Sequence, residues 1–187
     1  MTEVDNEAIQ EVIDKFAIHE LMSEYEMMYD HFPLPHGGGT GDFNAFDELD
    51  NIDIEDHVDD FMELFTDDCV VDYGIHGRIE GKKALRDFQL AYFKKETEFV
   101  DWFHLVANPW IEVHDNEARG KWNFFGPYIM EGAGACFHFS TYDNTFVKDD
   151  GEWKIENLKL TLKYMSPYDG GWEDVPIDDV FLSGDSM

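Results

Sequence analysis

The chain has 187 residues and a net charge of −29, because 42 acidic side chains stand against 13 basic ones. A surface of this sign repels nucleic acids and anionic membranes, so neither is expected as a partner. Sixteen Phe, eight Tyr and five Trp residues supply enough apolar area for a hydrophobic core, which argues against a disordered chain. The length fits a single domain.

The acidic residues are spread over the chain, for example at 59–60, 67–68 and 149–150, instead of gathering in one tail. High salt screens the mutual repulsion that such a surface creates, so this pattern is typical of a protein adapted to strong salt. We therefore expect a halophilic protein. An acidic interaction module is the weaker alternative, because its charges should cluster.

The first ten residues lack the basic and apolar regions of a signal peptide, and no apolar run is long enough to span a membrane. We therefore expect a cytoplasmic protein. Cys69 and Cys136 stand in separate predicted elements without metal-ligand spacing. This arrangement predicts two buried, reduced thiols.

The first predicted element is an amphipathic helix over residues 6–29. Its apolar positions recur at helical spacing and begin with Ile9, Val12, Ile13 and Phe16. Residues 31–56 follow with two prolines, four closely spaced glycines and many acids, which predicts a long loop. The glycines favour a role for this loop as a lid over a pocket mouth.

Two further helices, over 56–66 and 81–96, flank a short strand pair at 69–73 and 78–80. After them we predict an antiparallel meander with strands at 100–113, 117–130, 134–148 and 152–165. Helices followed by a meander indicate an α+β fold, in which the helices pack on one concave face of a curved sheet. Residues 169–187 form an acidic C-terminal tail.

Several short motifs occur in an order typical of one family. They are LFTDD at 64–68, Gly81 before the third helix, His104 with Pro109 five positions on, GKW at 120–122, and DGEW at 150–153. Together they resemble the SnoaL-like group of the nuclear-transport-factor-2-like superfamily, which includes polyketide cyclases, scytalone dehydratase and bile acid 7α-dehydratase. The resemblance implies a cone-shaped, curved antiparallel sheet with three N-terminal helices on its concave face and a pocket between them. It also implies a single domain over 1–168, into which the loop 31–56 is inserted.

The same resemblance implies a catalytic group at the end of the first helix. In the family's dehydratases a tyrosine and an aspartate five residues later meet a histidine from the sheet. Tyr25 and Asp30 match that pair, and His104 matches the histidine by its distance from Pro109. Tyr29 directly precedes Asp30, so either tyrosine could point inward.

Two positions depart from the pattern. The dehydratases pair the histidine with an aspartate four positions after the tryptophan of the GxW motif, and this chain has Gly126 there. Leu162 stands where the bile acid enzymes carry an arginine on the last strand. The histidine therefore lacks its expected carboxylate partner, unless Asp30 replaces it.

His104 lies in an apolar run, where an imidazole can be tuned to move protons near neutral pH. As a general base it would take a proton α to a substrate carbonyl, while Tyr25 donates a hydrogen bond to the enolate oxygen. Asp30 would hold the imidazole in one tautomer, and the protonated His104 could then give its proton to a leaving hydroxyl. Without a leaving group the same parts give isomerisation or cyclisation. The structural alternatives stay open: a core histidine, a packing tyrosine, and a solvated aspartate at a helix end.

A second set of candidates lies on the strands. His138 alternates with Ser140, Tyr142 and Asn144 on one strand face, which meets either a substrate or a partner subunit. The substrate-binding candidates are Tyr29, Asn123, Tyr128, His138 and Tyr142.

We expect no metal site and no cofactor. His31 and His36 lie in the long loop, where no fixed ligand geometry is expected, and neither a calcium loop nor a phosphate loop is present.

These patterns favour a cofactor-independent lyase or isomerase, dehydratase- or cyclase-like, that acts on a small apolar hydroxy-carbonyl substrate. The alternative is a non-catalytic ligand-binding or assembly protein on the same fold, because one fold hosts many functions. A subunit of a larger oxygenase is a third possibility. We expect a homodimer or homotrimer, since exposed sheet surfaces in this fold are commonly buried by self-association.

Overall fold

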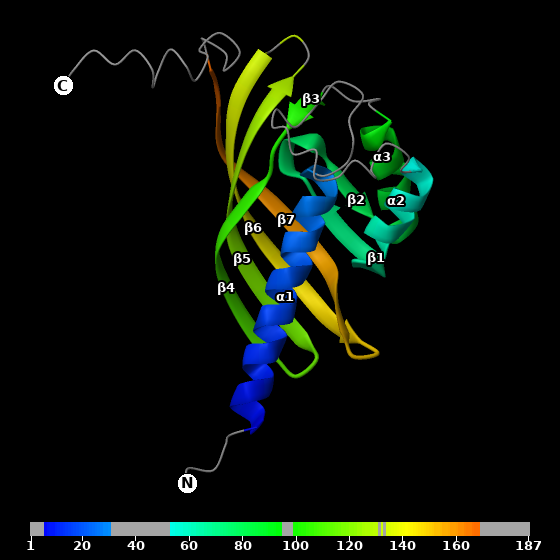
Figure 1. Cartoon of the computed structure of the whole chain (residues 1–187), viewed down its shortest axis with the longest axis vertical. Helices are drawn as coiled ribbons and strands as arrows, with labels where there is room; N and C mark the ends of the chain where they lie inside the picture. The colour runs from blue at the N-terminus through cyan, green and yellow to red at the C-terminus, as the bar shows by residue number, and fades with distance from the viewer. Residues whose placement is uncertain (1–5, 31–52, 95–98, 131, 133, 169–187) are drawn as a thin grey trace, which may run out of the picture.

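The computed structural model describes residues 6–30, 53–94, 99–130, 132 and 134–168. These residues form three α-helices packed against one curved sheet (Figure 1). Most of the predicted loop at 31–56 and all of the predicted tail at 169–187 lie outside the described residues. The α+β class and the order of helices and strands are confirmed.

The helices are α1 (Asn6–Asp30), α2 (Ile54–Met62) and α3 (Lys82–Phe93). The side chain of Asp53 caps α2 by accepting a hydrogen bond from the backbone N–H of Glu55, at 2.8 Å. The predicted second helix is too long at its C-terminal end. Phe65 already belongs to a strand, and the carbonyl of Leu64 accepts the backbone N–H of Ile155.

The seven strands are β1 (Phe65–Asp72), β2 (Arg78–Glu80), β3 (Phe99–Trp102), β4 (Leu105–His114), β5 (Glu117–Met130), β6 (Gly134–Asp149) and β7 (Glu152–Pro167). They form one sheet in the order β2-β1-β7-β6-β5-β3, with β4 also paired to β5. The β1–β7 pair is parallel, whereas the others are antiparallel. The sheet is therefore mixed, and the predicted antiparallel pairing is confirmed for every described pair except this one.

The predicted strand at 100–113 is divided into β3 and β4, and both parts pair with β5. At the division, Phe103 still donates its backbone N–H to the carbonyl of Pro127 at 3.1 Å. The next residue, His104, donates its backbone N–H to the carboxylate of Asp30 on α1. The division of the strand is thus the place where the sheet edge is attached to the end of the first helix.

The core lies between the helices and the concave face of the sheet. Ile18 and Met22 of α1, Phe61 of α2, Leu85 of α3 and Trp122 of β5 are all buried there. Both cysteines are free and buried, as predicted. No described helix is both long and apolar enough to cross a membrane.

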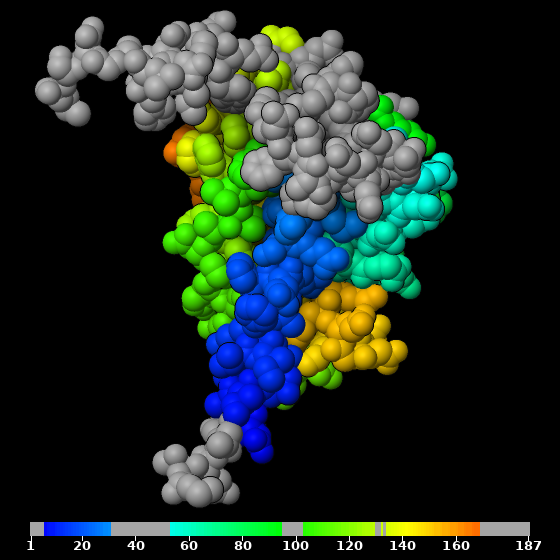
Figure 2. Space-filling model, viewed as in Figure 1, coloured from blue at the N-terminus to red at the C-terminus, as the bar shows by residue number. Residues whose placement is uncertain are grey.

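The N-terminal half of α1 differs from the prediction. Its apolar side chains are exposed, namely Ile9, Val12, Ile13 and Phe16. The start of the helix extends beyond the edge of the sheet (Figures 1 and 2). Further along, α1 turns inward the face that carries Asp14 and Ile18, so the opposite face with these apolar side chains stays open to solvent. The helix still contacts the sheet near Asp14, which accepts hydrogen bonds from Lys148 at 2.6 Å and from Trp153 at 3.0 Å.

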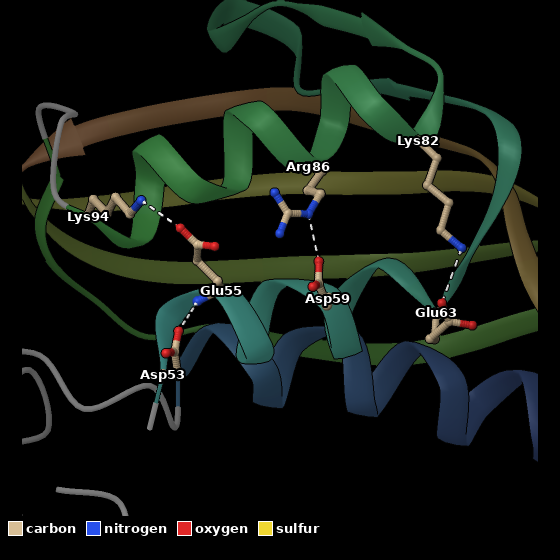
Figure 3. A network of polar contacts seen from close by, with 7 residues as sticks. All are labelled: Asp53, Glu55, Asp59, Glu63, Lys82, Arg86 and Lys94. Carbon is tan, nitrogen blue, oxygen red and sulfur yellow. Dashed lines mark hydrogen bonds and ion pairs between the residues drawn. The ribbon is translucent and has the colours of Figure 1, made fainter. Parts of the chain in front are cut away.

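Helices α2 and α3 are joined on their exposed sides by a row of ion pairs (Figure 3). Asp59 accepts the Nε–H of Arg86 at 2.6 Å, and longer pairs connect Glu63 with Lys82 and Glu55 with Lys94. Each exposed pair contributes little to stability. The opposite side of α3 faces the interior, where Gln89 is buried.

Candidate active site

An aromatic cavity of about 500 Å³, counted with its open mouth, lies between the helices and the sheet. It is lined by side chains from α1, α3, β5, β6 and β7, from the turn after β1 and from the division between β3 and β4. These residues are Tyr25, Tyr29, Tyr73, His76, Phe88, Tyr92, His104, Phe124, Tyr128, His138, Tyr142 and Leu160. Nine of the twelve are tyrosine, phenylalanine or leucine, so the cavity favours a largely apolar ligand held by a few polar contacts.

The end of α1 directs both candidate tyrosines into this cavity. Tyr25 and Tyr29 are four residues apart and therefore lie on the same face of the helix, with ring centroids 5.3 Å apart. Both are buried and both line the cavity. Both tyrosines therefore point into the cavity.

Asp30, the last residue of α1, meets His104. Its Oδ1 lies 2.6 Å from the imidazole Nδ1, and its two oxygens accept the backbone N–H of His104 at 3.0 and 2.9 Å. The two side chains are only 11% and 9% exposed. Because a carboxylate only accepts hydrogen bonds, the imidazole Nδ1 that contacts Asp30 carries the proton. Nε2 is then left as a proton acceptor. Asp30 thus supplies the carboxylate partner of the histidine that this chain lacks at position 126.

Gly126 has no room for the aspartate of the family pattern. A Cβ built at this position would lie 2.9 Å from the rings of both Phe124 and Tyr128, and 3.0 Å from the carbonyl oxygen of Phe103. Both rings line the cavity. Aromatic side chains therefore occupy the space into which a side chain at position 126 would extend.

Four polar side chains form a hydrogen-bonded cluster in the cavity wall. Tyr73 is its centre: its hydroxyl is 2.9 Å from that of Tyr29, accepts from Tyr25 at 3.3 Å, and accepts from the Gln89 amide at 3.0 Å. Gln89 also donates to Tyr29 at 2.6 Å. Burial raises the pKa of Tyr73 to about 12 and the pKa values of Tyr25 and Tyr29 well above their usual range. These hydroxyls therefore keep their protons and act as hydrogen-bond donors.

The sequence did not identify Tyr73 or Gln89. The available signal was weak: Gln89 is a polar residue on the buried side of α3, between Leu85 and Tyr92. Glu26 was also missed, although it is an acid within the buried stripe of α1.

His138 lies in the opposite wall of the cavity and is 2% exposed. Its Nε2 is 2.7 Å from the hydroxyl of Ser140, and its ring packs against Phe124 and Tyr128. Burial, followed by the proximity of His76 and His104, lowers the pKa of His138 to about 4. It is therefore neutral at physiological pH.

The predicted polar face of β6 points into this chain and not towards a partner subunit. His138, Ser140, Tyr142 and Asn144 are all buried, and two of them line the cavity. Tyr128 on β5 lines it as well.

Asn123 was predicted to bind substrate, but it does not line the cavity. It is exposed on the outer side of the sheet, because side chains alternate along β5 and Trp122, Phe124 and Tyr128 occupy the inner side.

Among the residues that the structure describes, no group of three His, Cys, Asp or Glu side chains has an arrangement that could hold a metal ion.

Comparisons with known proteins agree with this architecture. The model of the SnoaL-like domain family matches residues 52–159. No curated protein matches the sequence significantly.

Several solved structures share the fold. A scytalone dehydratase-like protein from Novosphingobium aromaticivorans is 20% identical, with a TM-score of 0.62 over 84% of this chain and 89% of its own. The hexachlorocyclohexane dehydrochlorinase LinA-type3 from Novosphingobium barchaimii is 19% identical, with a TM-score of 0.64 over 90% and 99%. A type 2 LinA is 18% identical, with a TM-score of 0.65 over 86% and 93%. By its fold and by the family model that it matches, this chain belongs to the SnoaL-like domain family.

Proposed function

We propose that the chain is a lyase or isomerase that works without a cofactor, and that His104 is its general base. The observation that carries this proposal is the contact of His104 with Asp30 at the wall of the aromatic cavity. The family, whose fold is shared by a scytalone dehydratase-like protein and by dehydrochlorinases, supports elimination chemistry as the reaction type.

In the proposed reaction Nε2 of His104 takes a proton from the carbon next to a substrate carbonyl. The imidazolium that forms is stabilised by Asp30, whose carboxylate already accepts the Nδ1–H. Positioned acid–base groups of this kind contribute about 10²–10⁴-fold in rate. Asp30 also accepts the backbone N–H of His104, so the same carboxylate fixes both the imidazole and the main chain that carries it.

The negative charge that develops on the carbonyl oxygen needs a hydrogen-bond donor. We assign this role to Tyr25, because its contact with Tyr73 is long, at 3.3 Å, and is the easiest in the cluster to exchange for a contact with substrate. A donor fixed in advance in a site with little water stabilises such an oxyanion strongly. If the substrate carries a hydroxyl group on the next carbon, loss of water follows, with His104 returning its proton to the leaving oxygen.

The cavity supports a small, largely apolar hydroxy-carbonyl compound as the substrate. Its aromatic rings bury apolar groups, while His104, His138 and the tyrosine hydroxyls offer a few polar contacts. No lysine or arginine is among the lining residues, so an anionic substrate is disfavoured.

The test is a panel of small β-hydroxy ketones, followed by the absorbance of the conjugated enone and by exchange of the α-proton for deuterium. The expected result is turnover by the wild type and a loss of about 10²-fold or more in His104→Gln. His114→Gln is the matched control, because His114 is exposed on β4. A folded His104→Gln protein that retains wild-type turnover would contradict the proposal.

A ligand-binding protein is the second candidate, and Gly126 favours it, since the dehydratases that the chain resembles carry an aspartate there. A binding protein predicts equal ligand affinity in wild type and His104→Gln, without product or deuterium exchange in either.

A further inference from the structure

Glu26 of α1 is a buried acid without a counter-ion. The residue is 3% exposed, and neither carboxyl oxygen has a hydrogen-bond partner among the described residues. Asp14 on the same helix is also buried, but it accepts hydrogen bonds from Lys148, Trp153 and Gln10. Burial of an unpaired carboxyl is costly, so its presence needs a reason other than packing.

The groups around Glu26 belong to the candidate active site. Asp30 lies one helical turn further along α1, and the carboxyl interacts electrostatically with His104 and with tyrosines 73, 92, 128 and 142. The hydroxyl of Tyr142 is the donor that approaches it, although outside the geometry of a formed hydrogen bond. Glu26 therefore belongs to the buried polar groups around the candidate site, although it does not itself line the cavity.

These neighbours act on Glu26 with opposite signs. Burial raises the pKa of Glu26 to about 7, and the negative charge of Asp30 raises it as well, whereas His104 and Tyr142 lower it. With His104 neutral, Glu26 holds its proton near neutral pH. A positive charge on His104 favours the carboxylate form of Glu26, so protonation of one group promotes release of the proton from the other.

We propose that Glu26 is a second proton donor of this site, which releases its proton through the Tyr142 hydroxyl when His104 becomes positively charged. This role rests on the proposed function of His104 as the base, and Glu26 acts through Tyr142 as a positioning residue.

The protons balance. The carbon–hydrogen bond breaks and its proton goes to Nε2 of His104, while the electron pair forms the new double bond. The bond to the leaving oxygen breaks, this oxygen takes the proton of Tyr142, and Tyr142 takes the proton of Glu26. The products are the unsaturated compound and water, together with a His104 imidazolium and a Glu26 carboxylate. Transfer of the proton from His104 to Glu26 through solvent restores the starting state.

The test follows the titration of the Glu26 carboxyl carbon by NMR in the full chain without substrate. Glu26→Gln identifies the signal, and Glu24→Gln, on the exposed side of the same helix, is the matched control. The expected midpoint in the wild type is near 7. The midpoint should rise in His104→Gln, which lacks the histidine that lowers the pKa of Glu26. It should fall in Asp30→Asn, which lacks the negative charge that raises this pKa.

A midpoint near 4.5 in the wild type, or one that neither variant moves, would overturn the proposal. Because this measurement needs no substrate, it is separate from the turnover test of His104. If the Glu26 midpoint does not respond to the two substitutions but the enzyme turns over substrate, only the role of Glu26 is contradicted. If the midpoint responds but no His104-dependent turnover is found, the proposed function is contradicted, and with it the catalytic use of the Glu26 proton.

Discussion

Asp30 accepts hydrogen bonds from both the imidazole and the backbone N–H of His104, a residue 74 positions away in the chain. One carboxylate therefore fixes the position of the main chain and the tautomer of the side chain at the same time. This double contact attaches the divided edge strand to the end of α1, and it is the basis of the function proposed for the cavity.

Replacing Asp30 with asparagine should impair both stability and activity. The backbone N–H of His104 contacts both carboxylate oxygens, so the amide group of asparagine would place one NH₂ against another donor. We expect a loss of about 1–3 kcal/mol in the free energy of unfolding, measured by urea denaturation, and a fall of about 10²-fold or more in turnover. Asp149→Asn, at an exposed position, is the control and should change neither.

Introducing the family aspartate at position 126 should destabilise the protein and not improve it. The Cβ alone would lie within 3.0 Å of two rings and one backbone oxygen, and a carboxylate would add an unpaired charge. Overpacking of this kind costs about 1–3 kcal/mol, so Gly126→Ala should lower the unfolding midpoint and Gly126→Asp should lower it further. Asn123→Asp places a carboxylate on the outer side of the same strand and serves as the control. A Gly126→Asp protein as stable as Asn123→Asp would show that the two rings move aside.

Removing the hydroxyl of Tyr73 should loosen the cluster in the cavity wall. Tyr73 is the hydrogen-bond partner of Tyr25, Tyr29 and Gln89, so Tyr73→Phe leaves buried polar groups without this partner. The expected loss is about 1–3 kcal/mol in the free energy of unfolding. Tyr164→Phe removes a hydroxyl from an exposed tyrosine and should be neutral. An equal effect of the two substitutions would mean that the cluster does not stabilise the fold.

Glu26 should make the protein less stable as the pH rises from about 4.5 to about 7. In this window the unfolded chain loses the Glu26 proton while the folded chain keeps it, so the folded state binds more protons and its stability falls with increasing pH. A pKa raised from 4.5 to about 7 corresponds to on the order of 3 kcal/mol. Glu26→Gln should abolish this loss and be more stable than the wild type above neutral pH, whereas Glu24→Gln should follow the wild type.

The check is the difference in melting temperature between each variant and the wild type, recorded over this pH range. Parallel curves for Glu26→Gln and wild type would show that the carboxyl ionises as readily in the folded chain as in the unfolded one.

Local pattern predicted much of this fold. The helical spacing of 6–29 and the alternation along the strands depend on neighbouring residues, and the structure confirms the elements in that order. The parallel β1–β7 pair could not be predicted in this way, because it joins segments far apart in the sequence. The exposure of Phe16 could not be predicted either, because α1 turns another face inward, the one that carries Asp14 and Ile18.

The candidate site was predicted in part, and the errors have physical causes. Asp30 and His104 were found through motif spacing, which reflects where the fold places the end of α1. Asn123 and Tyr128 have opposite parity on one regular strand, so they could not both face inward. Tyr73 and Gln89 come from two different elements and meet only in three dimensions, so no local pattern pointed to them.

The central claim is that Asp30 fixes the proton of His104 on Nδ1 and leaves Nε2 as the base. Nitrogen NMR of the His104 imidazole above neutral pH tests this most directly, because protonated and unprotonated ring nitrogens have well separated shifts. We predict a protonated Nδ1 and an unprotonated Nε2 in the wild type, and a mixture of tautomers in Asp30→Ala. A wild-type imidazole that carries its proton on Nε2 would contradict the account, since the nitrogen available to substrate would then be a donor and not a base.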